Sequence, residues 1–202
     1  MTDIRAIIFD FGRVISAQKP PSLFRRYEQE LELPPGQLNR IMYGSPAWEE
    51  TLLGRRSLDD YWREIGPQLG LHTAGDIQGF RQRYFSDEAP NPGVRQLLDQ
   101  LHGRYKLAVL SNAPRGLSKW LADWGILSLF DVVVCSGEEG VAKPDPTIYR
   151  LALDRLGVEP GEAVFVDDSR GHVAAARELG IHAIHFTTAA ALADALSDLQ
   201  IL

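Results

Sequence analysis

Five short apolar runs, separated by longer amphipathic stretches, constrain the fold more than any other feature of this sequence. Four of them are rich in Val, Ile or Leu and lack clear polar alternation, which is typical of parallel strands covered on both faces. Helical patterns lie between them, and several end at a glycine, a common helix stop. The pattern predicts an α/β fold with a doubly wound, five-stranded parallel sheet. The predicted strands are Ala6–Phe9, Leu107–Leu110, Val132–Cys135, Ala163–Val166 and His182–Phe186. The predicted helices of the same region are Asn91–His102, Arg115–Trp124, Asp145–Leu156, Ser169–Leu179 and Ala189–Leu199.

The first connection is far longer than the others. About a hundred residues separate Asp10 from the second predicted strand, whereas a crossover needs only about a dozen or more. The excess shows no convincing strand and several amphipathic helical patterns. We therefore predict a small α-helical cap inserted after the first strand, with residues 1–15 and 89–202 as the core domain and residues 16–88 as the cap domain. Ser57 and Asp76 are predicted helix N-caps. The predicted cap helices are Leu23–Leu31, Gly36–Tyr43, Leu58–Leu69 and Ile77–Phe85.

Charge and composition exclude several function classes. The 202 residues carry a formal net charge of -6 with no basic run, which argues against nucleic-acid binding. No apolar run approaches the length of a membrane span, and the first residues lack a signal-peptide pattern. Cys135 is the only cysteine; it is either a reactive thiol or, as its apolar neighbours favour, a buried small hydrophobe. We expect a cytoplasmic protein, a monomer or a homodimer, with a small-molecule partner.

Polar side chains stand where the predicted strands end. Asp10 ends the first strand, Ser111 and Asn112 the second, and the pair Asp167-Asp168 the fourth, while Lys143 follows the third in a loop. The carboxyl ends of parallel strands share one edge of the sheet, where ligands bind in such folds. This edge would carry three carboxylates, a hydroxyl, an amide and an ammonium group. Such a set is best suited to hold an anion together with a metal ion.

These segments resemble the motifs of the haloacid dehalogenase superfamily. That family has an apolar strand ending D-x-D-G-[TV], a strand ending in Ser or Thr, a loop Lys, and a strand ending in paired acids. Here the four stand in order along the whole chain, with a helical cap after the first. The joint occurrence is specific, whereas any single motif is weak. Within the family, FDFGRVIS followed by GSPAWEETLLGRRS is most similar to the sugar-phosphate phosphatase branch. The resemblance implies a Rossmann-like core and hydrolysis of a small organic phosphate monoester, such as a sugar phosphate.

The resemblance also implies roles for individual residues. Asp10 would attack phosphorus and form an aspartyl-phosphate. Mg²⁺ would be held by Asp10, the backbone carbonyl of Gly12 and Asp168, and Asp167 would support these ligands from behind or reach the ion through a water molecule. Phosphoryl oxygens would be bound by Ser111, Asn112 and Lys143, which would also offset the charge of Asp10. The implied catalytic residues are Asp10, Ser111, Asn112 and Lys143, and the substrate-binding set adds Arg13, Trp48 and Glu49.

One position departs from the family pattern. The second Asp of the first motif protonates the leaving group and later activates water, but Gly12 stands there in this chain. Its carbonyl keeps the metal role, whereas the acid–base role is lost, and such proton transfer typically contributes about 10²–10⁴-fold. Three explanations stay open: a good leaving group such as an anomeric sugar phosphate or an acyl phosphate, help from Arg13 or a cap carboxylate (Glu49 or Glu50) through water, or a non-catalytic binding protein.

Two other functions compete with the phosphatase hypothesis. A 2-haloacid dehalogenase also lacks the second Asp, but its fourth motif carries Ser and Asn instead of the acid pair in VDDSRG. A phosphometabolite-binding protein that keeps the fold without turnover is the other. Among remaining candidates, Trp62 and Tyr61 are expected in the core of the cap, Trp48 near the substrate, and the histidines in structural roles. These histidines are His72, His102, His172, His182 and His185.

Overall fold

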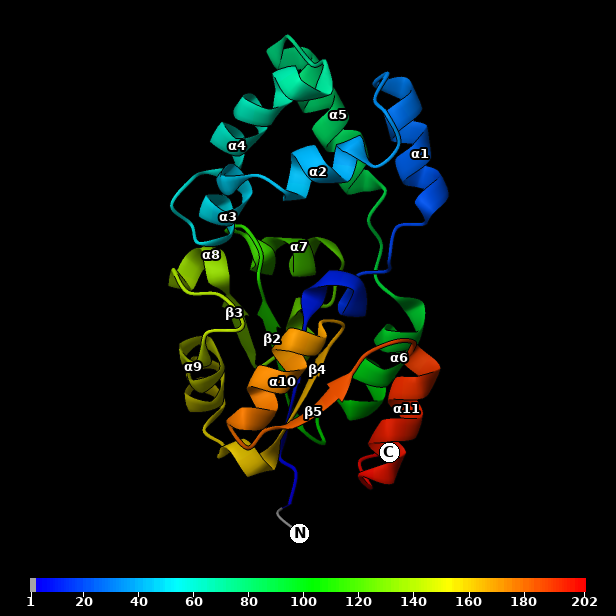
Figure 1. Ribbon diagram of the computed structural model, residues 1–202. Helices are drawn as coiled ribbons and strands as arrows, with labels where there is room; N and C mark the ends of the chain where they lie inside the picture. The colour runs from blue at the N-terminus through cyan, green and yellow to red at the C-terminus, as the bar shows by residue number, and fades with distance from the viewer. Residues whose placement is uncertain (1–2) are drawn as a thin grey trace.

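A computed structural model describes residues 3–202 and contains one five-stranded, wholly parallel sheet with strand order β3-β2-β1-β4-β5 (Figure 1). The predicted doubly wound fold is confirmed, and each predicted strand lies within one residue of an observed one. The strands are β1 (Ala6–Phe9), β2 (Lys106–Ser111), β3 (Val132–Cys135), β4 (Ala163–Asp167) and β5 (His182–His185).

Apolar side chains point to both faces of the sheet, and helices cover each face. Ile7 and Phe9 of β1 belong to one apolar cluster, whereas Ala6 and Ile8 belong to the other, as the two-residue period of a strand requires. The first cluster includes side chains of α6 (Pro92–Leu101), α7 (Leu117–Asp123) and α11 (Ala189–Asp198). The second includes α9 (Pro146–Leu156) and α10 (Arg170–Glu178). Double coverage explains why the strands are continuously apolar.

Five helices between β1 and β2 form a separate layer beyond the carboxyl edge of the sheet, at the top of Figure 1. They have an apolar cluster of their own, in which Tyr61 and Trp62 are almost fully buried. The cluster supports the division into a core and a cap domain, which stays a prediction. The helices, called the cap below, are α1 (Pro21–Glu30), α2 (Gln37–Tyr43), α3 (Pro46–Leu52), α4 (Leu58–Ile65) and α5 (Ala74–Ser86).

Several predicted helix limits in the cap were wrong. Helix α3 was not predicted, because its seven residues give too short a pattern, although Ser45 caps it with Pro46 in its first turn. Helix α4 ends at Ile65, and a 3₁₀ turn over Gly66–Leu69 follows it, because Pro67 lacks the N–H to continue the helix.

The predicted N-caps met different outcomes. Ser57 caps α4, as predicted. Helix α5, however, is capped by Thr73, and Asp76 is the reciprocal partner of Thr73 in a capping box. Outside the cap, a short helix α8 (Ser136–Glu139) follows β3 and was also not predicted.

Hydrogen bonds join the cap to the core on two sides. The two linkers run antiparallel, with hydrogen bonds from the N–H of Ala17 to the Ala89 carbonyl (2.8 Å) and from that of Asn91 to the Ile15 carbonyl (2.7 Å). On the other side, Ser136 Oγ donates to the Leu52 carbonyl at 2.6 Å. The cap therefore lies closed over the carboxyl edge of the sheet. Across residues 3–202, no helix combines the length and apolar character that crossing a membrane requires.

Candidate active site

Strands β1 and β4 are neighbours at the point where the strand order reverses. Phe9 pairs with Val166, and the Asp10 N–H donates to the Val166 carbonyl at 2.8 Å. This register brings Asp10, just past β1, beside Asp167 at the end of β4. The prediction that these two acids share one edge of the sheet is therefore confirmed. Ligands bind at such a reversal point in doubly wound sheets.

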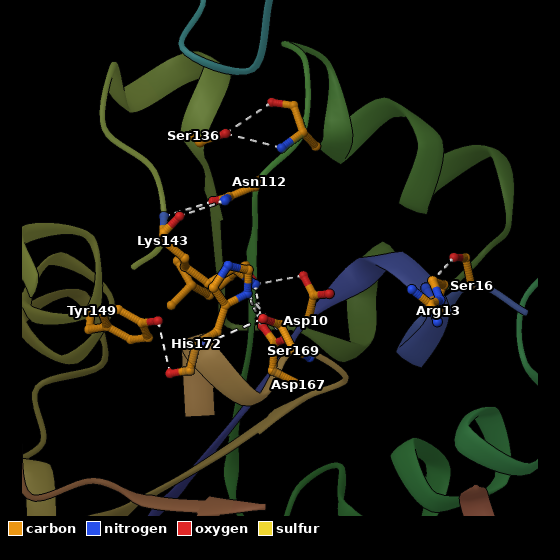
Figure 2. A network of polar contacts seen from close by, with 12 residues as sticks. Asp10, Arg13, Ser16, Asn112, Ser136, Lys143, Tyr149, Asp167, Ser169 and His172 are labelled. Atoms are coloured by element: carbon orange, nitrogen blue, oxygen red, sulfur yellow. Dashed lines mark hydrogen bonds and ion pairs between the residues drawn. The ribbon is translucent and has the colours of Figure 1, made fainter. Parts of the chain in front are cut away.

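Lys143 joins the two acids. Its Nζ lies 2.7 Å from Asp10 Oδ1 and 2.7 Å from Asp167 Oδ2 (Figure 2). The same Nζ also donates to the Leu110 carbonyl at 2.8 Å. The Lys143 and Asp167 side chains are almost completely buried. Buried charges persist only when they are paired and hydrogen-bonded, so this triad is a single electrostatic unit.

Asn112 fixes the loop that carries Lys143. Its side-chain amide donates to the Lys143 carbonyl and accepts from the Lys143 N–H, both at 2.8 Å. The sequence resemblance implied that Asn112 binds phosphoryl oxygens, and this role stays a prediction. In the structure its amide bonds to the backbone of Lys143 and so positions the ammonium group.

His172 is a member of the network that sequence reasoning missed. Its Nδ1 lies 3.0 Å from Asp167 Oδ2 and 3.2 Å from Oδ1, and the Ser169 N–H donates to Oδ1 at 2.7 Å. Ser169 also caps α10, which brings His172 in the first turn back toward Asp167. The available signal was this capped turn directly after the acid pair.

Asp10, Asp167 and Asp168 each offer a carboxylate oxygen, and these oxygens lie within 4.8 Å of one another. Hard oxygen donors in such a group fit Mg²⁺, which is bound by few protein carboxylates with water completing its octahedron. The Asp167 oxygens already accept from Lys143, His172 and Ser169, whereas Asp168 faces an Arg13 nitrogen at 3.0 Å. This difference supports Asp168 as the direct ligand and Asp167 as the one that positions it.

Burial and the neighbouring groups shift the pKa values of the Asp10 and Asp167 carboxyls in opposite directions. Burial raises the pKa of Asp10 above its ordinary value of 3.8; the Lys143 charge opposes this shift, and the Asp167 and Asp168 charges add to it. Burial alone would also raise the pKa of Asp167, but hydrogen bonds from His172 and Lys143 outweigh it, and that pKa lies below its ordinary value. Asp10 is therefore the carboxyl whose negative charge is least well compensated before substrate and metal bind.

A cavity of about 530 Å³ lies between this network and the cap. Gly12, Arg13, Ser111, Asn112 and Trp48 line it, which brings most of the predicted substrate-binding residues together. Glu49 is exposed and is not among the lining residues, so its predicted substrate contact is not supported by the geometry. Glu50 is paired with Arg56 on the surface.

The remaining sequence candidates have structural environments. Cys135 is buried, its Sγ lies 3.1 Å from the Ala113 carbonyl oxygen, and burial raises the pKa of its thiol to about 11, so it acts as a small hydrophobe and not as a nucleophile. His185 Nε2 lies 3.0 Å from the Asp168 carbonyl oxygen, and His182 is exposed. The five histidines form no metal-ligand set among residues 3–202.

Comparison with known proteins shows one consistent likeness. The family model of the haloacid dehalogenase-like hydrolases matches residues 4–180. A phosphorylated carbohydrates phosphatase from Thermotoga maritima is 31% identical over 194 residues, which cover 90% of this chain and 84% of that protein. An (S)-2-haloacid dehalogenase from Xanthobacter autotrophicus is 29% identical over 187 residues, covering 88% and 72%.

Two further likenesses are to a much longer protein and to a solved structure of lower sequence identity. The chain spans only 18% of the mouse acyl-CoA dehydrogenase family member 10, to which it is 30% identical over 191 residues. Among solved structures, a haloacid dehalogenase family enzyme from Bacteroides thetaiotaomicron, in complex with magnesium and inorganic phosphate, superimposes with a TM-score of 0.74. It is 20% identical, and the match covers 92% of this chain and 95% of that one, so this likeness concerns the fold.

Proposed function

Because the chain belongs to the haloacid dehalogenase-like hydrolases, we propose that it is a magnesium-dependent phosphatase that hydrolyses a small organic phosphate monoester through an aspartyl-phosphate on Asp10. The observation that carries the proposal is the buried contact of Lys143 with Asp10 and Asp167 at 2.7 Å each, beside the Asp168 carboxylate. A nucleophilic carboxylate, a cation for phosphoryl charge and a metal-binding acid pair are the parts that phosphoryl transfer requires.

The residues have distinct tasks in this reaction. An Asp10 oxygen attacks phosphorus, while the Lys143 ammonium group compensates the negative charge that gathers there. Asn112 holds the Lys143 loop, and His172 and Ser169 hold the Asp167 carboxylate. Magnesium, when bound by Asp10, Asp168 and the Gly12 carbonyl, would neutralise phosphoryl charge. The magnesium and phosphate of the Bacteroides structure support this cofactor.

The sequence resemblance predicts a sugar phosphate as substrate, and the likeness to the Thermotoga phosphorylated carbohydrates phosphatase supports a phosphorylated carbohydrate. The substrate, the oligomeric state, the cytoplasmic location and the absence of nucleic-acid binding stay predictions.

A phosphate-release assay tests the proposal. The protein would be incubated with a broad panel of phosphate monoesters and acetyl phosphate in Mg²⁺ and in EDTA, with Asp10→Asn as the matched variant. We expect release that requires both Mg²⁺ and Asp10. The proposal is contradicted if Asp10→Asn still releases phosphate, or if the wild-type protein releases phosphate from none of the compounds.

The two competing functions have separate readouts. The dehalogenase hypothesis, favoured by the likeness to the Xanthobacter enzyme, requires chloride release from 2-chloropropionate in EDTA. The hypothesis of a binding protein, favoured by Gly12, requires that beryllium fluoride with Mg²⁺ forms no acyl-phosphate mimic on Asp10 of the folded protein. We expect no chloride release and a Mg²⁺-dependent mimic.

A further inference from the structure

The cavity above the active site has an unusually aromatic wall. Nine of its lining residues are aromatic, which is half of the aromatic residues in the chain. On the core side, Phe11 directly follows Asp10, and its ring centroid lies 6.2 Å from that of Trp120. Trp120 in turn lies 5.7 Å from Phe85 of the cap. Aromatic surface therefore continues from the residue after the nucleophile up to the cap.

The cap side of the cavity continues this surface. Trp48 is half-buried, with the rings of Tyr43 and Tyr61 at centroid distances of 5.3 Å each. Tyr61 and Trp62 belong to the apolar cluster of the cap, as the sequence predicted, and they also line the cavity. Aromatic rings bind other rings by stacked or edge-to-face contacts.

The tyrosine hydroxyls on the cap side are already bonded within the protein, whereas the buried Trp62 Nε1 has no hydrogen-bond partner among residues 3–202. The Tyr61 hydroxyl donates to the Met42 carbonyl, and the hydroxyls of Tyr43 and Tyr84 are bonded to each other.

The charged groups near this wall are also paired. Lys19 contacts Glu88 at 3.0 Å and lies 3.5 Å above the Tyr84 ring. A sugar has many hydroxyls to satisfy, whereas an aromatic group needs mainly apolar faces. The free surface of this wall suits the second kind of ligand.

Gly12 gives a second, independent constraint on the leaving group. It has no side chain to donate a proton, and the only carboxyl among the cavity-lining residues is that of Glu88, which is paired with Lys19. A leaving group that receives no proton departs as an anion. A phenol has a pKa of about 10, like the Tyr side chain. A hydroxyl with the acidity of water is a much weaker acid, and it leaves far less readily when no acid protonates it.

We propose that the preferred substrates are phosphate monoesters of aromatic, phenol-type alcohols, and not the sugar phosphates that the sequence resemblance predicts; this inference rests on the proposed phosphatase function. In the first step, the bond from an Asp10 oxygen to phosphorus forms as the phosphorus–oxygen bond to the aryl group breaks, and the electron pair leaves on the phenolate. In the second, water attacks phosphorus and restores the Asp10 carboxylate, giving dihydrogen phosphate. The phenolate then takes one proton from it, so the products are a phenol and hydrogen phosphate.

A substrate panel separates ring binding from leaving-group acidity. It contains phenyl and 2-naphthyl phosphates, which have a ring and a phenolate leaving group, and benzyl phosphate, which has a ring and an alkoxide leaving group. Glucose 1-phosphate and glucose 6-phosphate represent sugars, and acetyl phosphate reports the chemistry without an organic ring. We expect kcat/KM for 2-naphthyl phosphate at least tenfold above that of either sugar phosphate, and kcat for phenyl phosphate at least a hundredfold above that of benzyl phosphate.

Two variants test the wall itself. Trp48→Leu removes a ring from the cavity, whereas Tyr105→Leu removes a half-buried ring of the core that does not line it. We expect Trp48→Leu to lower the ratio of kcat/KM for 2-naphthyl phosphate to that for acetyl phosphate at least tenfold, and Tyr105→Leu to leave the ratio within twofold.

The outcomes distinguish this inference from the proposed function. The aryl preference is overturned if hydrolysis depends on Asp10 but kcat/KM is higher for a sugar phosphate than for 2-naphthyl phosphate, or if kcat is the same for benzyl and phenyl phosphate. The proposed phosphatase function would stand in both cases. An unchanged ratio in Trp48→Leu also overturns the aryl preference. No Asp10-dependent hydrolysis of any compound, acetyl phosphate included, overturns both.

Discussion

At the scale of single residues, the site depends on an imbalance of buried charge. One ammonium group, that of Lys143, contacts two buried carboxylates, and a third acid stands next to them. The carboxyl with the raised pKa, Asp10, is also the proposed nucleophile. Catalytic groups often carry such an energetic cost, which the rest of the fold offsets.

Asp10→Asn should abolish turnover without destabilising the protein. Because folding disfavours the charged form of Asp10, an isosteric neutral side chain removes that cost. We expect activity to fall by at least about 10³-fold and the melting temperature in EDTA at neutral pH to stay equal or rise. Because the pKa of Asp10 is higher in the folded protein than its ordinary value of 3.8, the wild type loses stability as the pH rises above that value. The gain in stability of Asp10→Asn over the wild type should therefore shrink as the pH falls toward 3.8.

Lys143→Met is the contrasting variant. It leaves Asp10 and Asp167 buried without their cation, and breaking a buried pair in this way costs about 3–5 kcal/mol. Urea denaturation of both variants in EDTA measures the difference. Equal destabilisation by Asp10→Asn and Lys143→Met would be inconsistent with the charge imbalance.

Gly12→Asp should restore part of the missing acid–base function. The backbone has φ -64°, which any residue adopts, and an added Cβ would meet only Asp10 Oδ2 at 3.7 Å, an ordinary contact. We expect the ratio of kcat for benzyl phosphate to that for phenyl phosphate to rise at least tenfold, because only the alkoxide needs a proton. Gly12→Asn has the same size without the acid and should leave the ratio near wild type; a similar rise there would exclude an acid–base effect.

The sequence predicted some residue environments and not others. Asp10, Lys143, Asp167 and Asp168 were predicted to converge because strand ends share an edge whatever the loops do. His172 and the backbone role of Asn112 were missed, since both depend on the direction of a side chain within a loop or a first helical turn. The substrate contact of Glu49 stays a prediction without support from the cavity lining, because the direction of this side chain depends on α3, which was itself not predicted.

At the scale of elements, the loop after α3 connects the cap to the core. Ser136 of α8 donates to the Leu52 carbonyl at 2.6 Å, and Arg115 donates to the Gly54 carbonyl at 3.3 Å. Gly54 has φ +65°, and a Cβ added to it would overlap the Gly137 carbonyl oxygen. This contact was beyond sequence reasoning, because it joins two loops far apart in the chain. The strands, in contrast, were predictable from their continuous apolar character.

Gly54→Ala should separate the cap from the core. An added Cβ would lie 1.9 Å from the Gly137 carbonyl oxygen and 2.8 Å from Arg115 Nε, so the loops must move apart. We expect kcat/KM to fall at least tenfold and amide hydrogen exchange to increase in the loop around Leu52–Gly54.

Gly36→Ala is the matched control. Gly36 also has a positive φ, +79°, but an added Cβ would meet nothing within 4 Å. The two variants share a backbone strain of about 1–2 kcal/mol, while only Gly54→Ala has the clash. Equal effects of both on kcat/KM would mean that strain, and not cap docking, is responsible.

At the scale of the whole molecule, the site joins strands β1 and β4 with the loop after α8, and the cap closes over it (Figure 1). Metal binding at Asp10 and Asp168 should therefore stabilise the complete core. At a Mg²⁺ concentration of about 100 times Kd, the gain is about 2.7 kcal/mol, which corresponds to about 5–10 °C in melting temperature for a domain of this size.

Thermal unfolding with MgCl₂, compared with KCl of equal ionic strength, measures this gain. Asp168→Asn should lose it, while keeping the fold in EDTA. A shift of the same size in Asp168→Asn would show that Mg²⁺ acts at another site.

The most direct test of the account is to trap the covalent intermediate. A single-turnover reaction with a ³²P-labelled phosphate monoester, quenched in acid within milliseconds and digested, should give a labelled peptide that contains Asp10 and loses its label to hydroxylamine, as an acyl phosphate does. The Asp10→Asn variant should give none. Label on a different residue, or complete hydrolysis in which no protein-bound phosphate ever appears, would contradict Asp10 as the nucleophile.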